Sequence, residues 1–166
     1  GMSAVIPPID GLEGTPYLTN DNIFDLEELP PRLCVLGAGY VGLELGQAMA
    51  RFGSEVTIAE SGEQLLKREM RHVAHTLEKR MREEGIQFRT GRKATSVEHN
   101  GGTFRIAFDS GDAIEAEGLL VATGRKPNTT SLNAEKAGVE LGERGEVKIN
   151  ERFETSREGV YAIGDC

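Results

Sequence analysis

The sequence predicts an α/β fold: a Rossmann-like parallel sheet with an inserted antiparallel β-meander, arranged in three ββα layers. Two observations indicate it. Short apolar runs at 33–36 and 56–59 flank a glycine-rich turn and a segment with helical spacing, which is the pattern of a strand–helix–strand unit. Three short alternating segments follow between residues 94 and 116, separated by hairpin-type turns. A buried strand at 119–122 then returns the chain to the parallel sheet.

Size and charge narrow the classes of protein that the chain can represent. It has 166 residues, a net charge of −8, 38% apolar and 28% charged residues, which suits one compact globular domain. The acidic balance disfavours nucleic acids and anionic membranes as partners. No apolar run approaches the ~20 residues of a membrane span. Cys34 lies in an apolar run and is expected to be a buried thiol, Cys166 has no assigned role, and the low cysteine count fits the cytoplasm.

The first thirty residues are interpreted as an interdomain linker. Five prolines lie within residues 1–31, and prolines favour extended connections. One short helix is expected at 23–29, because polar residues that cap helices precede it and Pro30 would stop it.

The elements after residue 31 are predicted from spacing. A helix at 40–52 should bury Val41, Leu45, Ala48 and Phe52 and end at Gly53. A second helix at about 66–84 should bury Leu66, Met70, Val73, Leu77 and Met81, followed by a strand at 86–89. The alternating segments 94–98, 103–108 and 113–116 form the meander. A short helix is expected near 132–136 and a final strand at 160–163.

The turn between the first strand and helix predicts a dinucleotide site. Its residues are Gly37, Ala38, Gly39, Tyr40, Val41 and Gly42, a G-x-G-x-x-G pattern in the strand-to-helix context that this motif requires. Gly37 would permit the turn, Gly39 would let a pyrophosphate approach the backbone, and Gly42 would let the helix pack close to the sheet. The N–H groups at the helix start would bind the phosphates.

Glu60 completes this pattern at the end of the second strand, where an acidic residue accepts hydrogen bonds from the adenosine ribose. A carboxylate there would repel a 2′-phosphate, so we expect NAD(H) to be preferred over NADP(H). Lys67 and Arg68 lie a few residues further on and could partly offset this preference.

Four motifs occur in order: G-A-G-Y-V-G-L-E-L-G, V-T-I-A-E, V-A-T-G-R-K-P-N-T and G-V-Y-A-I-G-D-C. Together they resemble those of the class I pyridine nucleotide-disulfide oxidoreductases, a family that includes dihydrolipoamide dehydrogenase, glutathione reductase and mercuric reductase. The proline-rich start looks most like the mercuric-reductase branch. The resemblance covers nearly the whole chain and implies a longer parent enzyme, an FAD-dependent NAD(P)H oxidoreductase.

The resemblance also implies a domain organisation. Residues 31–150 would be the NAD(P)-binding domain, and residues 151–166 the start of a returning FAD-domain segment; a dimerisation domain would follow in the parent. The family's redox-active cysteine pair and its His–Glu acid/base pair have no match in these residues. We therefore expect the chain by itself to lack reductase activity.

Several residue roles are implied by the same resemblance. Tyr40 matches a tyrosine that covers the flavin until nicotinamide displaces it, or it is simply an aromatic packed at a helix start. Glu44 matches a glutamate near nicotinamide and flavin, with an exposed helix glutamate as the alternative. The strand-end loop near the cofactor comprises Ala122, Thr123, Gly124 and Arg125. Asp165 matches an FAD-ribitol ligand and, in this chain, is expected at the surface or disordered.

Two other functions remain open from the residues alone. The chain could be a non-catalytic nucleotide-binding Rossmann module, or an FAD-binding domain, since flavin sites use the same glycine turn. His72 and His75 lie one turn apart on the second predicted helix, but no further ligand is evident, so no metal site is predicted.

Overall fold

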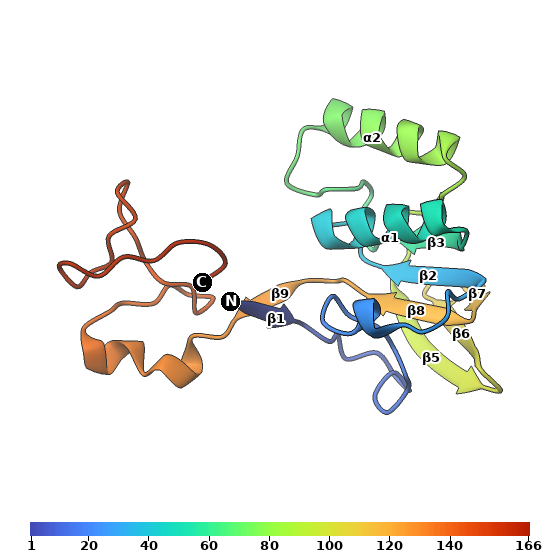
Figure 1. Cartoon of the computed structure of the whole chain (residues 1–166). Helices are drawn as coiled ribbons and strands as arrows, with labels where there is room; N and C mark the ends of the chain where they lie inside the picture. The colour runs from blue at the N-terminus through green and yellow to red at the C-terminus, as the bar shows by residue number, and fades with distance from the viewer. The chain divides into compact units, whose positions relative to one another are not determined.

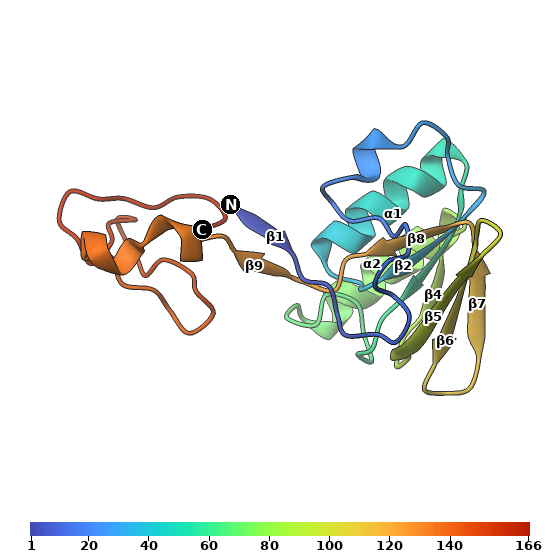
Figure 2. The same cartoon turned by 90° about the horizontal axis from the view of Figure 1, so that it is seen from below.

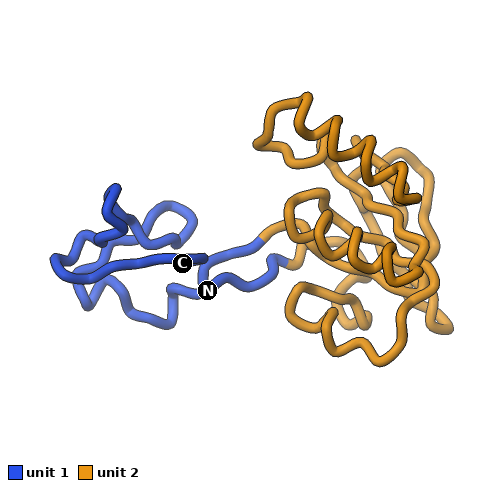
Figure 3. Tube along the Cα trace, turned by 45° about the horizontal axis from the view of Figure 1, so that its top comes forward, with its two compact units in different colours: residues 1–5, 125–166 blue, residues 6–124 orange.

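The computed structural model describes residues 1–166, which divide into two compact units (Figure 3). The larger unit comprises Ile6–Gly124, and the smaller one Gly1–Val5 together with Arg125–Cys166. These bounds differ from the predicted segments 1–30, 31–150 and 151–166. The assignment of those segments to domains of a parent enzyme stays a prediction.

A four-stranded parallel sheet is the centre of the larger unit, with strand order β4-β3-β2-β8. Its strands are β2 (Arg32–Leu36), β3 (Glu55–Ala59), β4 (Gln87–Arg89) and β8 (Gly118–Val121). The inner strands are apolar because both faces of the sheet are covered. The predicted strands are confirmed, each with its ends shifted by a residue or so.

Two helices cover one face of this sheet, α1 (Tyr40–Phe52) and α2 (Arg71–Glu83) (Figure 1). Leu33, Val35 and Leu120 point from the sheet into the core that the helices share. The helix α1 ends at Gly53, whose φ of 118° places it in the left-handed region, as predicted.

The meander covers the opposite face, so the predicted three-layer ββα fold is confirmed (Figure 2). It consists of β5 (Ala94–Asn100), β6 (Thr103–Phe108) and β7 (Ala113–Ala116), all antiparallel. Cys34, Leu36 and Val121 alternate with the helix-facing residues and pack against it. Burial raises the pKa of the Cys34 thiol to about 12, which makes it the inert buried thiol that was expected.

The buried face of α1 differs from the predicted one. Gly42, Leu43, Gly46 and Met49 are buried, whereas Phe52 is 74% exposed. A Cβ at Gly46 would lie 3.1 Å from the Ile58 side chain. The helix therefore approaches the sheet through glycines, as predicted for Gly42, and the spacing of apolar side chains alone does not reveal this face.

The helix α2 begins five residues later than predicted. Leu66 is buried but has a φ of +47°, which is incompatible with a helix, and its N–H donates to the Ala38 carbonyl. Met70 and Val73 are exposed, so the predicted core stripe is wrong at these two positions. The helix buries only Ala74 and Met81, with Leu77 partly buried between them.

The segment before β2 packs as part of the larger unit. Leu12 is fully buried in the core between the parallel sheet and the meander. Ile23 is fully buried in the core between the parallel sheet and the helices. Leu18 pairs in parallel with Leu120, next to β8. The predicted helix at 23–29 is shortened to one 3-10 turn, η1 (Ile23–Asp25), because Leu26 is already extended.

The smaller unit is mostly irregular. Its strands β1 (Met2–Ala4) and β9 (Arg125–Pro127) pair antiparallel, and two 3-10 turns follow: η2 (Thr130–Leu132) and η3 (Ala134–Ala137). The predicted strand at 160–163 is wrong. Only Tyr161 forms a bridge, to Glu154, and Ile163 is 76% exposed. An apolar run becomes a buried strand only where neighbouring strands cover it, and here it has a single bridge.

The start of β2 is joined to β8 by an ion pair. The Arg32 guanidinium and its backbone N–H both donate to the Glu117 carboxylate, and the Glu117 N–H donates to the Arg32 carbonyl. The hydrogen bond from Arg32 holds the pKa of Glu117 below its ordinary value of 4.5.

We predict that Glu117→Gln lowers the thermal unfolding midpoint at pH 7. Because the pKa of Glu117 is depressed in the folded state, its contribution is complete above the ordinary value of 4.5 and is lost as the pH falls through the lower folded-state pKa. The difference from the parent protein should therefore shrink below pH 4.5. Thermal scans from pH 7 to pH 3 measure this, with Glu13→Gln at an exposed position as control. A difference that is constant with pH would contradict the assignment.

Candidate functional site

The candidate site is the glycine turn between β2 and α1. Gly37 has a φ of +106°, and a Cβ there would lie 2.4 Å from the Ala122 carbonyl oxygen. A Cβ on Gly42 would lie 2.1 Å from the Gly37 carbonyl oxygen. A Cβ on Gly39 would meet nothing within 4 Å. Two of the three glycines thus permit close backbone packing, and the third faces open space.

The first turn of α1 presents unpaired N–H groups beside this space. The first helical hydrogen bond runs from the Leu43 N–H to the Gly39 carbonyl, 3.0 Å away. The N–H groups of residues 40–42 precede it and have no helical acceptor. Gly39 is the N-cap residue and supplies no capping side chain. This helix start can therefore donate hydrogen bonds to an anion.

Glu60 lies at the end of β3, next to the turn. One of its carboxylate oxygens accepts from the Ala38 N–H at 2.9 Å, and the other from the Gly62 N–H at 2.8 Å. The Ala38 N–H is thus used to orient the carboxylate and is not available to a phosphate. The oxygen bonded to Gly62 also accepts from the Ser61 hydroxyl at 3.2 Å, whereas the oxygen bonded to Ala38 can accept a further hydrogen bond. The carboxylate therefore keeps the capacity to accept from a ligand hydroxyl.

The loop between β3 and α2 folds back onto the turn. The Leu66 N–H donates to the Ala38 carbonyl at 2.9 Å. The Tyr40 hydroxyl donates to Glu69 Oε1 at 2.5 Å. Sequence reasoning missed Glu69, because residues 66–70 read as helix and no local pattern marks a contact with Tyr40, 29 residues away.

The remaining predicted site residues fall into two groups. In the larger unit, Glu44 is exposed on α1, and Ala122, Thr123 and Gly124 follow the end of β8. Arg125 and Asp165 belong to the smaller unit, where they form an ion pair of 2.7 Å. Asp165 is thus exposed, as expected, but it has a partner that the sequence did not indicate.

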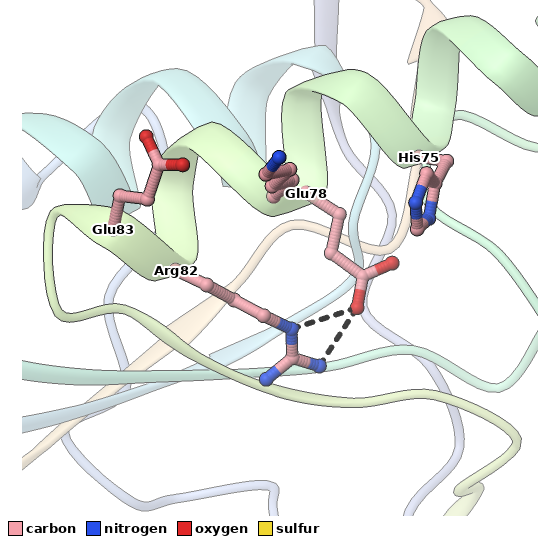
Figure 4. A pocket seen from close by; sticks show the side chains of 5 residues that line it. His75, Glu78, Arg82 and Glu83 are labelled. Atoms are coloured by element: carbon pink, nitrogen blue, oxygen red, sulfur yellow. Dashed lines mark hydrogen bonds and ion pairs between the residues drawn. The ribbon is translucent and has the colours of Figure 1, made fainter.

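A separate shallow pocket lies along α2 and is lined by His75, Glu78, Lys79, Arg82 and Glu83 (Figure 4). The guanidinium of Arg82 donates to Glu78 at 2.7 and 2.9 Å, so these two charges already neutralise each other. His72 and His75 are both exposed. No group of three or more His, Cys, Asp or Glu side chains is arranged to hold a metal ion. No helix is long and apolar enough to cross a membrane.

Comparison with known proteins identifies relatives along the entire chain. The family model described as pyridine nucleotide-disulphide oxidoreductase matches residues 1–166. The mercuric reductase of Lysinibacillus sphaericus is 44% identical over 168 residues, covering 99% of this chain. The dihydrolipoyl dehydrogenase of Thermus scotoductus is 44% identical over 144 residues, covering 84% of this chain. The chain spans 31% of the length of each of these proteins.

Solved structures also match along nearly the whole chain. The HOCl-induced flavoprotein disulfide reductase RclA of Escherichia coli matches with a TM-score of 0.86 and 33% identity, over 99% of this chain and 38% of that one. LpdA of Mycobacterium tuberculosis matches with a TM-score of 0.84 and 31% identity, over 100% of this chain and 36% of that one.

We predict that Gly42→Ala destabilises the protein by about 1–3 kcal/mol, because the added methyl group would overlap the Gly37 backbone, which cannot move without displacing the turn. Gly39→Ala is the matched control, since its methyl group meets open space and its φ of −79° suits alanine. Chemical denaturation of both variants measures the free energies of unfolding. Equal losses would show that close packing at Gly42 is not the constraint described here.

Proposed function

Because this chain belongs to the pyridine nucleotide-disulphide oxidoreductase family, we propose that its larger unit binds NADH and positions the nicotinamide for hydride transfer to FAD in the whole protein. The observation that carries this proposal is the pairing of an open helix start at Gly39 with the oriented carboxylate of Glu60. It is the combination that a dinucleotide, with its diphosphate and ribose, requires.

The pyrophosphate would lie against the start of α1. Support comes from the open space at Gly39 and from the N–H groups of residues 40 and 41, which have no helical acceptor. These donors and the helix dipole both favour a negatively charged group. The N–H groups of Gly37 and Ala38 are already bonded, to the Ala59 carbonyl and to Glu60. They would serve to fix the shape of the turn.

The adenosine ribose would bind Glu60. Two backbone N–H groups orient the carboxylate, so a ribose diol would meet a prearranged acceptor. A 2′-phosphate would meet the same negative charge, which supports NADH as the preferred cofactor. Lys67 and Arg68 are exposed on the following loop and would reduce this discrimination without reversing it.

The nicotinamide would lie toward the end of β8. In the strand order β4-β3-β2-β8, the ribose-binding strand β3 and the strand β8 flank β2 on opposite sides. A dinucleotide that crosses the start of α1 therefore extends from Glu60 toward Ala122–Gly124. Glu44, one helical turn beyond Tyr40, would border this half of the site.

The chemistry is divided between the cofactors and the protein. Bound FAD supplies the acceptor for the hydride. The residues of this chain bind and orient the dinucleotide: Glu44 would lie closest to its reactive ring, and Tyr40 would lie at the helix start beside the pyrophosphate. We propose that reductase activity needs groups outside these 166 residues, so the chain alone should bind NADH without catalysing disulfide or dye reduction.

We predict that the 166-residue chain binds NADH at least about tenfold more tightly than NADPH, since the carboxylate of Glu60 favours a diol over a phosphate. Glu60→Gln should weaken NADH binding about tenfold, as expected for the loss of a hydrogen bond to a charged acceptor. It should also reduce the preference over NADPH. Isothermal titration calorimetry measures both, with Glu63→Gln on the same loop as control.

Two results would contradict the proposal. NADPH binding as tightly as NADH would remove the role assigned to Glu60. A purified chain that is yellow with bound flavin, and that does not bind NADH, would favour the alternative in which the glycine turn holds FAD.

A further inference from the structure

We propose that Glu69 is a positioning residue: it holds the Tyr40 side chain on the adenosine side of the site and so keeps the nicotinamide side open. This inference rests on the proposed function, because it concerns access to the same dinucleotide site. It adds a residue that neither the motifs nor the resemblance indicated.

Tyr40 needs such a partner because of where it lies. It is the first residue of α1, directly after Gly39, and it is 60% exposed. An exposed aromatic side chain on a helix has more than one staggered χ1 position available. In the structure, its hydroxyl donates to Glu69 Oε1 at 2.5 Å. That hydrogen bond selects one position of the ring.

Glu69 is well placed to act as a fixed acceptor. Its backbone N–H donates to the Leu66 carbonyl at 2.7 Å, and its carbonyl accepts from the Gln64 side chain at 3.1 Å. Leu66 in turn is buried and bonded to the Ala38 carbonyl. The carboxylate therefore belongs to a loop segment that is itself anchored to the glycine turn.

The topology indicates which side of the site this position leaves open. Glu69 belongs to the loop that leaves β3, the strand that Glu60 directly follows. The strand β8 lies on the other side of β2. A Tyr40 ring bonded to Glu69 is therefore directed toward the β3 side, away from the end of β8 where the nicotinamide is proposed to bind. Released from Glu69, the ring could turn toward that end and compete with the nicotinamide.

The size of the effect follows from the strength of one hydrogen bond. Losing it would shift the equilibrium between the Tyr40 positions by about three- to tenfold. The apparent affinity for NADH falls with the fraction of open molecules, so it falls by at most this factor. The bond also raises the pKa of the Tyr40 hydroxyl, chiefly because Glu69 accepts its proton in the hydrogen bond.

The test uses NADH titrations of the 166-residue chain by calorimetry. Glu69→Ala should weaken NADH binding measurably, by up to about tenfold, and Glu69→Gln, which keeps an acceptor oxygen, should recover part of the loss. Tyr40→Phe should weaken binding to the same extent, and adding Glu69→Ala to it should cause no further loss. Glu63→Ala, a charge removed from the same loop, is the control and should leave the affinity unchanged.

A second readout follows the bond itself. Tyrosine ionisation is followed by absorbance, with Tyr40→Phe used to subtract Tyr17 and Tyr161. Glu69→Ala should lower the pKa of Tyr40, and Glu63→Ala should not. A lowered pKa with unchanged NADH affinity would overturn the positioning role, and so would tighter binding by Glu69→Ala or additive losses in the double variant. If the unaltered chain binds no NADH, the proposed function fails instead, and the titration still shows whether the bond exists.

Discussion

The close approach of α1 to the end of β2 is the constraint on which the rest of the site depends. Only glycine at position 42 allows it, because any Cβ would overlap the Gly37 carbonyl oxygen. Gly37 itself has a positive φ and packs against the backbone at the end of β8. This packing places the unpaired N–H groups of the helix start beside open space, at the edge where the parallel strands β2, β3 and β8 end.

Two carboxylates beside this turn, those of Glu60 and Glu69, are each held by hydrogen bonds. The carboxylate of Glu60 is held by backbone N–H groups from both sides, and that of Glu69 accepts the Tyr40 hydroxyl. Both belong to the loop between β3 and α2, which Leu66 connects to the turn through the Ala38 carbonyl. One loop would thus orient the group that recognises the ribose and the group that controls the aromatic ring beside the pyrophosphate. The cofactor preference and the access of the nicotinamide would therefore depend on a single segment.

Sequence patterns predicted the layers and the turn because these depend on local signals. Each apolar run, each hairpin turn and the G-x-G-x-x-G motif is contained within a few consecutive residues. The errors arose where distant contacts decide the structure. Leu66 leaves the helical pattern to bond Ala38, Phe52 is exposed on α1 rather than buried, and Ile163 lacks the neighbours that would make its segment a strand. Glu69 could not be found in this way, since its partner Tyr40 is distant in sequence.

The most direct test of the central claim is an NMR titration of the isotopically labelled chain with NADH, observed at the backbone N–H groups. The account predicts that the largest chemical-shift changes fall on Gly39, Tyr40 and Val41, with smaller ones on the neighbours of Glu60. Changes confined to other surfaces, such as the α2 pocket, or no changes at saturating NADH, would contradict it.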